Sequence, residues 1–283
     1  MSFTAHLSLK TGFPVFKLSN RTETHQRPFG YGVMYRNLSS VPPKSVIAAL
    51  DKHYYSLLPS VPDGTWIVIH DYTELTPTVR EHLGRLRVIT IRKKVQALIP
   101  GSLFLHHPFF PFPLLPRAPK RPLCLSRLDY DKNIELILEA NRLGADITLW
   151  GFLNRLYAHH KLKNYDVNSS YRGAFPKSFG RIAELLSEAT ALVDMSIIKN
   201  DGGGSQYTLL EAIHAGVPLV LHKKWVDVSG SVWVDGENCL SVESPEELVK
   251  ALATPDKPLA SELLQRHISE DWASILTKEY SMG

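Results

Sequence analysis

The 283-residue chain has few cysteines and no long apolar run. Its only cysteines, Cys124 and Cys239, cannot form a disulfide framework, and Cys124 lies in a predicted buried strand, which favours a reducing compartment. No apolar run approaches the ~18 residues that a membrane-spanning helix needs, and the first residues lack the basic-then-apolar pattern of a secretory signal. We therefore expect a soluble, cytoplasmic protein without stable membrane insertion.

Acidic residues are scarce in the first part of the chain. Residues 1–120 contain 15 Lys and Arg against 6 Asp and Glu, a net charge of +9, whereas the remainder carries −5. This polarity suggests that the first part faces an anionic partner, the alternative being a basic surface that is merely solvated. Six cations crowd around one predicted helix–strand–helix corner, which favours a surface patch: Arg80, Arg85, Arg87, Arg92, Lys93 and Lys94.

The sequence shows no internal repeat and no low-complexity segment, and its length fits two Rossmann-like halves of ~120–150 residues. The expected boundary is the stretch 108–119, whose five prolines exclude a helix or a central strand and favour an extended connector. We expect its aromatic side chains to pack into an interdomain cleft rather than to bind a ligand.

Strands and helices are predicted to alternate along the chain, which indicates an α/β fold with parallel sheets. The predicted strands are 66–71, 87–91, 103–105, 123–128, 146–150, 191–195 and 217–221. The predicted helices are 177–187, 205–215, 245–253, 259–280 and one after residue 132 with the apolar face Ile134, Ile137, Leu138 and Leu143.

A glycine-rich loop runs into the helix 205–215, which carries one acid, Glu211, and ends at Gly216-Val217-Pro218. Glycines let backbone N–H groups approach a ligand closely, and a helix N-terminus favours a phosphate. A carboxylate two turns into the helix can accept hydrogen bonds from vicinal hydroxyls. These features indicate a site for a diphosphate and a ribose, although an ordinary βαβ unit can carry a similar loop.

A second motif places two cations at the carboxyl edge of a predicted sheet, where open α/β sheets bind ligands. Arg127 ends the strand 123–128, and Lys132 begins the following helix. Arginine offers a planar fork to a phosphate and lysine a point charge. Two solvated surface cations are the alternative interpretation.

These two motifs resemble the donor-binding half of retaining glycosyltransferases of the GT-B fold, over roughly residues 120–255. Arg127 and Lys132 match the diphosphate-binding pair of G-R-L-x-x-x-K-G, and Glu211 matches the ribose-binding acid of E-G-F-G-x-x-x-L-E-A-x-A-x-G-x-P. Gly203 stands where the family has its first acid, and Asp201 is a replacement if the loop is two residues longer. The sugar identity is therefore left open.

The resemblance implies a GT-B architecture with two Rossmann-like domains facing each other across a cleft. It places an acceptor domain at residues 1–117, a nucleotide-sugar domain at 118–265 and a C-terminal helix at 266–283 that packs back on the first domain. The implied donor is UDP-glucose or a similar UDP-sugar. No cofactor is expected, and neither is a metal or a dedicated Asp-x-Asp metal motif, since Arg127, Lys132 and N–H groups near 203–205 would neutralise the departing diphosphate.

Further contacts are expected on the same basis. Gly151 and Phe152 are expected to flank the nucleobase, and His70 and Asp71, which close a buried strand, to lie at the reacting centre, unless His70 is a structural histidine. The full set of expected donor contacts is Gly151, Phe152, Asp201, Gly203, Gly204, Ser205, Tyr207, Thr208 and Glu211. The expected acceptor contacts are Gly30, Tyr31, Gly32, Arg92, Lys93 and Lys94.

The pattern Tyr207-Thr208-x-Leu210-Glu211 is similar to a segment of bacteriophage DNA α-glucosyltransferases. Together with the basic first part, this resemblance favours double-stranded DNA as the partner and a hydroxymethylated pyrimidine as the acceptor, in a bacterial cytoplasm if the protein is phage-encoded. A glycosyltransferase acting on protein, lipid or polysaccharide is the alternative. A non-catalytic nucleotide-sugar-binding protein is a third hypothesis. The oligomeric state is not determined by the sequence.

Overall fold

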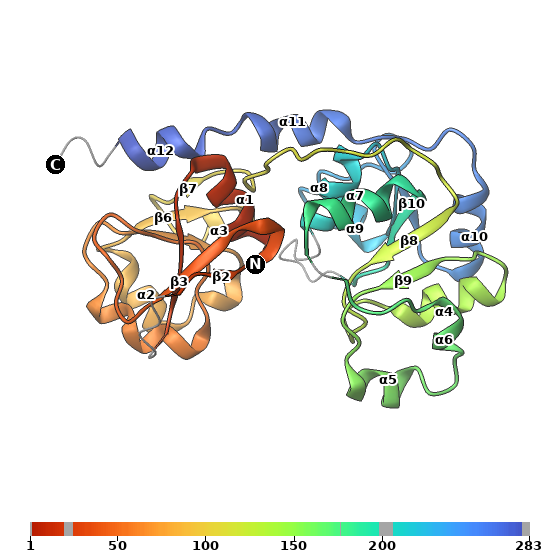
Figure 1. Cartoon of the computed structure of the whole chain (residues 1–283), viewed down its shortest axis with the longest axis horizontal. Coiled ribbons are helices and arrows are strands. Elements are labelled where there is room, and N and C mark those ends of the chain that lie inside the picture. Colours follow the sequence, from red (N-terminus) through yellow and green to blue (C-terminus); the bar gives the residue numbers. More distant parts are fainter. Residues whose placement is uncertain (1, 20–24, 176, 198–205, 279–283) are drawn as a thin grey trace. The chain divides into compact units, whose positions relative to one another are not determined.

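A computed structural model describes residues 2–19, 25–175, 177–197 and 206–278 of the chain (Figure 1). The chain divides into two compact units. The first unit consists of residues 1–110 and 266–283, and the second of residues 111–265. In the described residues, no helix has the length and apolar character needed to cross a membrane.

The first unit is built on two small sheets. A three-stranded sheet has the order β1-β3-β2, with β1 (Val15–Leu18) parallel and β2 (Arg27–Pro28) antiparallel to β3 (Met34–Leu38). A parallel sheet has the order β4-β5-β6-β7, and its strands are β4 (Val46–Ile47), β5 (Trp66–Ile69), β6 (Arg87–Thr90) and β7 (Leu103–Phe104). All four β5 side chains are buried, as the continuous apolar run predicts.

Helices of the first unit cover the core of the parallel sheet. Leu58 on the 3₁₀ segment η2 (Lys52–Ser60) and Val79 on α2 (Pro77–Leu83) pack with Ile67 and Ile69 of β5. The remaining elements before the connector are α1 (Ser2–Thr11), η1 (Gly30–Gly32), η3 (Tyr72–Glu74) and α3 (Lys93–Gln96). The predicted helix–strand–helix corner therefore corresponds to α2, β6 and α3.

Arg80, Arg85 and Arg87 at this corner have local structural partners. Arg85 donates to the backbone carbonyls of Val61 and Leu58 and lies 2.9 Å from a carboxylate oxygen of Asp63. Arg80 Nε donates to the Leu75 carbonyl at 3.1 Å. The Arg87 guanidinium lies 5.6 Å from the centre of the Trp66 ring. Lys93 and Lys94 are exposed.

The C-terminal segment forms two helices, α11 (Ser261–Ser269) and α12 (Trp272–Lys278), so the prediction of one helix over 259–280 is wrong. The two acids between them have other partners. Glu270 Oε2 accepts hydrogen bonds from the backbone N–H of His106 at 3.1 Å and from its Nδ1 at 2.7 Å. Asp271 accepts the N–H of Ser274 at 2.9 Å and so caps α12. α12 packs against α1 within the first unit.

The second unit contains a five-stranded parallel sheet with the order β12-β11-β10-β8-β9. Its strands are β8 (Arg121–Leu125), β9 (Thr148–Trp150), β10 (Ala189–Asp194), β11 (Leu219–His222) and β12 (Leu240–Val242). Each predicted strand of this region is present, with bounds shifted by a few residues. The chain next to β9 adds one parallel bridge, between Leu149 and Tyr171.

Helices cover both faces of this sheet (Figure 1). One face, with Cys124 and Leu149, packs with α4 (Ile134–Arg142) and α10 (Pro245–Ala253). The other helices of the unit are α5 (Arg155–Lys161), α6 (Val167–Ser170), α7 (Phe179–Ser187), α8 (Gln206–His214) and α9 (Lys224–Asp227). Leu143 follows α4 as its C-cap and is 51% exposed, so its predicted place on the apolar face is wrong.

Residues 108–119 form neither helix nor strand, as their prolines predict. Their aromatic side chains pack locally. Phe109 stacks on His6 in the first unit with ring centres 4.9 Å apart. Phe112 stacks on Phe179 in the second unit at 4.7 Å and accepts a hydrogen bond from His214 Nε2 at its carbonyl, 2.8 Å away. Phe109 and Phe112 thus each contribute to fixing the connector, one in each unit.

Candidate functional site

Polar groups gather where the strands of the second unit end. Arg127 and Lys132 follow β8, Gly151 follows β9, and β10 ends at Asp194. Because parallel neighbouring strands end at one edge of a sheet, and β8 lies between β10 and β9, these residues share that edge.

Lys132 is a buried cation with fixed partners. It is 5% exposed, and its Nζ donates to the hydroxyl of Ser196 at 3.1 Å. The backbone N–H of Ser196 donates in turn to Asp194 Oδ1 at 2.8 Å. Burying an ammonium group is costly unless polar groups surround it. Ser196 is one such group, and its hydrogen bond fixes the position of the Lys132 ammonium at the strand ends.

Arg127 is the exposed member of the pair, with 61% of its side chain accessible to solvent. Its guanidinium lies 3.4 Å from Asp129 Oδ2 and 3.8 Å from Asp131 Oδ2. Asp131 Oδ2 is also 3.2 Å from Lys132 Nζ. Asp129-Tyr130-Asp131 is an Asp-x-Asp triplet, in which Asp129 pairs with Arg127 and Asp131 pairs with both Arg127 and Lys132.

Gly151 brings β9 against the end of β8. Its φ is 151°, and a Cβ placed on it would lie 1.8 Å from the carbonyl oxygen of Ser126. Its own carbonyl accepts the hydroxyl of Tyr171 at 2.9 Å, and its N–H donates to the Gly173 carbonyl at 3.0 Å. Only glycine fits this position, because the backbone after β9 lies so close to the backbone that leads to Arg127.

The ring of Phe152 stands in solvent, 67% exposed, while its carbonyl accepts the N–H of Leu128 at 2.9 Å. The loops after β8 and β9 are joined a second time, because Asn154 Nδ2 donates to Asp129 Oδ1 at 2.9 Å. An exposed aromatic ring on a fixed backbone offers a stacking surface for a flat ligand.

The helix predicted to carry the ribose-binding acid is α8. Glu211 lies on its buried side beside Leu210 and Ala212 and is 2% exposed. Tyr207 and Thr208 are half-buried. The helix ends at Gly216, whose φ is 66°, with the N–H of Val217 bonded to the Ala212 carbonyl at 2.9 Å. The other predicted donor contacts, Asp201, Gly203, Gly204 and Ser205, lie outside the described residues.

In the first unit, His70 follows β5 and is enclosed. Its Nε2 lies 2.8 Å from the Ala48 carbonyl, and its ring meets the Phe3 ring edge-on at 4.7 Å. Burial, and to a smaller degree Arg92, lowers the pKa of His70. Asp71 caps η3 by accepting the N–H of Thr73 at 2.8 Å. Burial raises the pKa of the adjacent Glu74 to about 7, although its carboxylate accepts the His70 N–H at 3.0 Å.

The predicted acceptor residues of the first unit lie on two separate elements. Tyr31, in η1 between Gly30 and Gly32, has a φ of 61° and is 4% exposed, with its ring centre 5.2 Å from that of His6. Arg92 precedes α3 and is half-buried, and Lys93 Nζ lies 5.9 Å from the centre of the Phe104 ring. The exposed Lys93 and Lys94 are the members of this set most accessible to a large anion.

Several residues at these edges were not identified from the sequence: Glu74, Asp129, Asp131, Asn154, Asp194 and Ser196. Asp194 and Ser196 close a buried strand at its carboxyl end, the same signal that identified His70 and Asp71. Across the described ranges, no group of three or more His, Cys, Asp and Glu side chains is arranged to hold a metal ion.

No protein-family model and no curated protein sequence matches the chain. Solved structures do match it. Sucrose-phosphate synthase from Thermosynechococcus elongatus superimposes with a TM-score of 0.62 at 14% identity, over 99% of this chain and 90% of that one. Anabaena HepE in complex with UDP gives 0.55 at 14% identity, over 77% and 71%.

TarM from S. aureus, solved with UDP and other ligands, gives a TM-score of 0.55 at 12% identity over 77% of this chain. The matched region covers 50% of the TarM chain, so this chain spans about half the length of TarM. At these identities the similarity establishes the architecture alone. Two α/β units with parallel sheets, matched by these structures, establish that the chain has the two-Rossmann-domain GT-B fold.

Proposed function

We propose that the protein is a glycosyltransferase that uses a nucleotide-sugar donor, with a UDP-sugar as the favoured donor. The observation that carries the proposal is the buried Lys132, held by Ser196 at 3.1 Å, next to the exposed Arg127 at the carboxyl edge of the second sheet. A sheet edge with one fixed and one adaptable cation suits a diphosphate. The UDP in complexes of HepE and TarM supports the same ligand class.

The rest of the donor fits the surrounding groups. Glu211 is proposed to accept hydrogen bonds from the ribose hydroxyls, and its burial keeps competing water away. Phe152 is proposed to stack on the nucleobase, since its ring is exposed while Gly151 fixes the backbone before it. Two loops that hydrogen-bond to each other through Asn154 and Asp129 hold this part of the edge in place.

In the proposed reaction, the bond between the sugar C1 and the diphosphate oxygen breaks and a bond from C1 to the acceptor oxygen forms. The electron pair of the broken bond leaves with the diphosphate, which also takes the proton of the acceptor hydroxyl. Arg127 and Lys132 stabilise the charge that develops on the leaving group. The proposal includes retention of the anomeric configuration and independence of a metal ion, as the resemblance to retaining enzymes implies.

The favoured acceptor is a hydroxymethylated pyrimidine in double-stranded DNA, as in phage-type DNA modification. Its support is the net charge of +9 over residues 1–120 and the exposure of Lys93 and Lys94. The similarity of Tyr207-Thr208-x-Leu210-Glu211 to DNA α-glucosyltransferases adds to it. His70 contacts the Ala48 carbonyl and Asp71 caps η3, so we propose that both residues primarily stabilise the fold of the first unit.

A transferase acting on protein, lipid or polysaccharide is the second candidate. One structural match, WaaB, is a lipopolysaccharide outer core galactosyltransferase. Polysaccharide and lipid acceptors are therefore included in the test. A non-catalytic nucleotide-sugar-binding protein is the third. We expect radiolabelled sugar to move from UDP-sugars to hydroxymethylated DNA and not to plain DNA. Transfer to a cell-wall extract alone would support the second candidate, and donor binding without any transfer would support the third.

Donor binding is tested by calorimetry with UDP. Arg127→Ala and Lys132→Ala are each expected to weaken binding by roughly 1.5–3 kcal/mol, the range for hydrogen bonds to charged groups. Arg142→Ala is the matched control, because Arg142 is an exposed arginine of the same unit that pairs with Glu139 on α4. Unchanged UDP affinity in both Arg127→Ala and Lys132→Ala would refute the donor site.

A further inference from the structure

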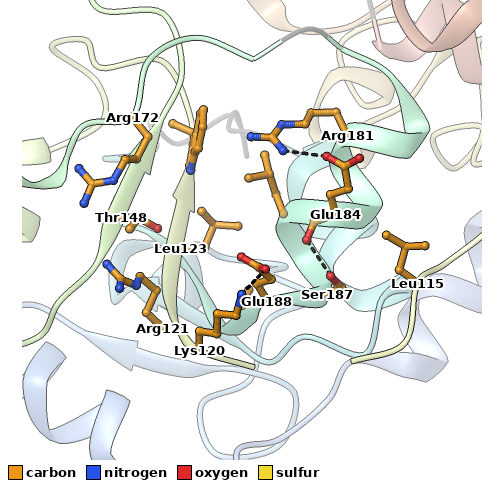
Figure 2. A pocket seen from close by; sticks show the side chains of 13 residues that line it. Leu115, Lys120, Arg121, Leu123, Thr148, Arg172, Arg181, Glu184, Ser187 and Glu188 are labelled. Atoms are coloured by element: carbon orange, nitrogen blue, oxygen red, sulfur yellow. Dashed lines mark hydrogen bonds and ion pairs between the residues drawn. The ribbon is translucent and has the colours of Figure 1, made fainter. Parts of the chain in front are cut away.

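The second unit contains a groove of about 730 Å³ on the face of its sheet that carries α7 (Figure 2). Its floor comes from β8 and β9 and one wall from α7. The lining residues are Leu115, Lys120, Arg121, Leu123, Thr148, Trp150, Arg172, Arg181, Glu184, Leu185, Ser187, Glu188 and Ala189. A groove of this size holds a small organic ligand.

The groove is separate from the strand-end site. β8 begins at Arg121 and ends at Leu125, so Arg121 lies at the amino end of the strand and Arg127 beyond its carboxyl end. Leu123, in the middle of β8, points into the groove, whereas its neighbour Cys124 packs in the core on the opposite face. None of the predicted donor residues that the structure describes lines the groove.

Four cations and two carboxylates line the groove, so positive charge is in excess. On the α7 side the charges are paired, with Arg181 2.7 Å from Glu184 and Lys120 2.5 Å from Glu188. The opposite side differs. Arg121 has only a loose pair with the exposed Asp146 at 3.6 Å.

Arg172 is the second cation of that side. Its guanidinium donates to the backbone carbonyls of Ser169 at 2.8 Å and Tyr171 at 3.4 Å, which orient it without neutralising it. Figure 2 shows the Arg172 and Arg121 side chains on the same side of the groove, with Arg172 above Thr148 and Arg121 below it. Two guanidinium groups and a hydroxyl placed in this way suit a phosphate, sulfonate or carboxylate.

Apolar groups line the groove between the Arg121 and Arg172 side and the paired charges on the α7 side. Leu123 and Ala189 form its floor, and the half-buried Trp150 has the Arg181 guanidinium 5.0 Å from its ring centre. Leu115, from the connector, is 48% exposed at the α7 side (Figure 2). A ligand that fills the groove therefore needs an apolar or aromatic body as well as an anionic group.

We propose that this groove is a second binding site, which takes a small amphipathic anion independently of the donor site. The anionic group binds between Arg121 and Arg172 beside the Thr148 hydroxyl, and the apolar body lies over Leu123 and Trp150. The site does not depend on the proposed glycosyltransferase activity, since its lining residues differ from the described residues of the strand-end site.

The probe for the test is 8-anilinonaphthalene-1-sulfonate, which combines an aromatic body with a sulfonate. Fluorescence titrations are carried out with the full chain, with and without saturating UDP, and 1-naphthyl phosphate serves as competitor. Arg121→Gln/Arg172→Gln is expected to weaken the probe's affinity about tenfold or more, since two charge-assisted contacts are lost. Arg142→Gln on α4, outside the groove, is the matched control and is expected to bind like the wild type.

Leu115→Glu provides a second variant that keeps both arginines and places a carboxylate at the rim, and it is expected to weaken binding as well. Unchanged circular dichroism spectra and melting temperatures establish that the exposed substitutions leave the fold intact. The proposal is overturned if the wild type does not bind the probe, if UDP displaces it, or if the double variant binds as tightly as Arg142→Gln. Loss of UDP binding in Lys132→Ala with the probe's affinity unchanged would support two separate sites.

Discussion

Asp131 Oδ2 lies 3.2 Å from the Nζ of Lys132, in the space between Lys132 and the guanidinium of Arg127. The carboxylate therefore occupies the electrostatic position that the proposal gives to a donor phosphate. Its side chain is 48% exposed, so it can turn away when an anion arrives. We infer that Asp131 competes with the donor for the two cations.

Asp131→Asn is therefore expected to strengthen UDP binding by about threefold to tenfold, because it removes a negative charge next to the diphosphate without shortening the side chain. Calorimetry at low and moderate salt measures the change, which should shrink as salt is added. Asp166→Asn, on the N-cap of α6 in the same unit, controls for net charge. Weaker binding in Asp131→Asn would show instead that the acid orients Lys132.

Ser196→Ala is expected to weaken UDP binding roughly tenfold, because Lys132 loses the hydroxyl that accepts its hydrogen bond at 3.1 Å. Uridine binding should not change, since the proposed target of Lys132 is the diphosphate. Ser196→Thr keeps a hydroxyl and should restore most of the affinity. Equal losses for UDP and uridine would indicate a general disturbance of the edge rather than positioning of the lysine.

Gly151→Ala is expected to destabilise the second unit by at least about 2 kcal/mol and to abolish UDP binding, since its Cβ would lie 1.8 Å from the Ser126 carbonyl oxygen. The backbone that leads to Arg127 would have to move. Gly180→Ala is the matched control, because a Cβ there meets nothing within 4 Å and the position is helical. Denaturant midpoints and UDP calorimetry compare the two variants, and equal behaviour would show that the contact is not rigid.

The motifs that predict a donor site are local in the sequence, and the structure forms their strand, turn and helix elements as expected. Lys132 is the fifth residue after Arg127, across one strand–turn–helix connection, and glycine at position 216 follows the end of α8 with a φ of 66°. The partner of Lys132 was not predictable in the same way. Ser196 reaches Lys132 only because β10 lies beside β8, and strand order is a property of the whole sheet.

The errors have similar causes. The segment 259–280 reads as one amphipathic helix, but Glu270 bonds to His106, 164 residues away, and Asp271 starts a new helix. Leu143 fits the helical apolar pattern, yet α4 has ended there and the side chain is exposed. Tertiary contacts override local patterns at each of these positions.

Acid is expected to destabilise the first unit through its buried histidines. Burial lowers the pKa of His267 to about 4 and holds the pKa of His107 well below its usual value, so both are neutral near pH 7 in the folded protein. Unfolded histidines titrate near 6.5, so the unfolded state binds more protons and stability falls as the pH drops from about 6.5 towards about 4. Burial raises the pKa of Glu74 to about 7. Its effect on stability is opposite to that of the histidines, because its stabilising contribution is present at low pH and is lost as the pH rises towards 7.

His267→Gln tests this prediction. Between pH 7 and pH 5 the wild type should lose about 2 kcal/mol more stability than this variant, because the glutamine takes up no proton while its amide can still donate to the His107 carbonyl. Urea unfolding at the two pH values measures the difference. His159→Gln, at an exposed site on α5, should keep the wild-type dependence. An unchanged pH dependence in His267→Gln would rule out this histidine as the source.

The final prediction concerns the DNA acceptor and rests on the exposed Lys93 and Lys94. Each phosphate that a protein neutralises releases condensed counterions, so log affinity should fall linearly with log salt, by about 0.9 per contact. Lys93→Ala/Lys94→Ala should reduce this slope by up to about two and leave UDP affinity unchanged, because the proposed donor residues belong to the second unit. Lys161→Ala/Lys163→Ala removes two exposed lysines of the second unit and is the matched control. If hydroxymethylated DNA fails to bind at ~50 mM salt, or binds with no salt dependence, DNA is not the acceptor, and the basic first part of the chain needs another anionic partner.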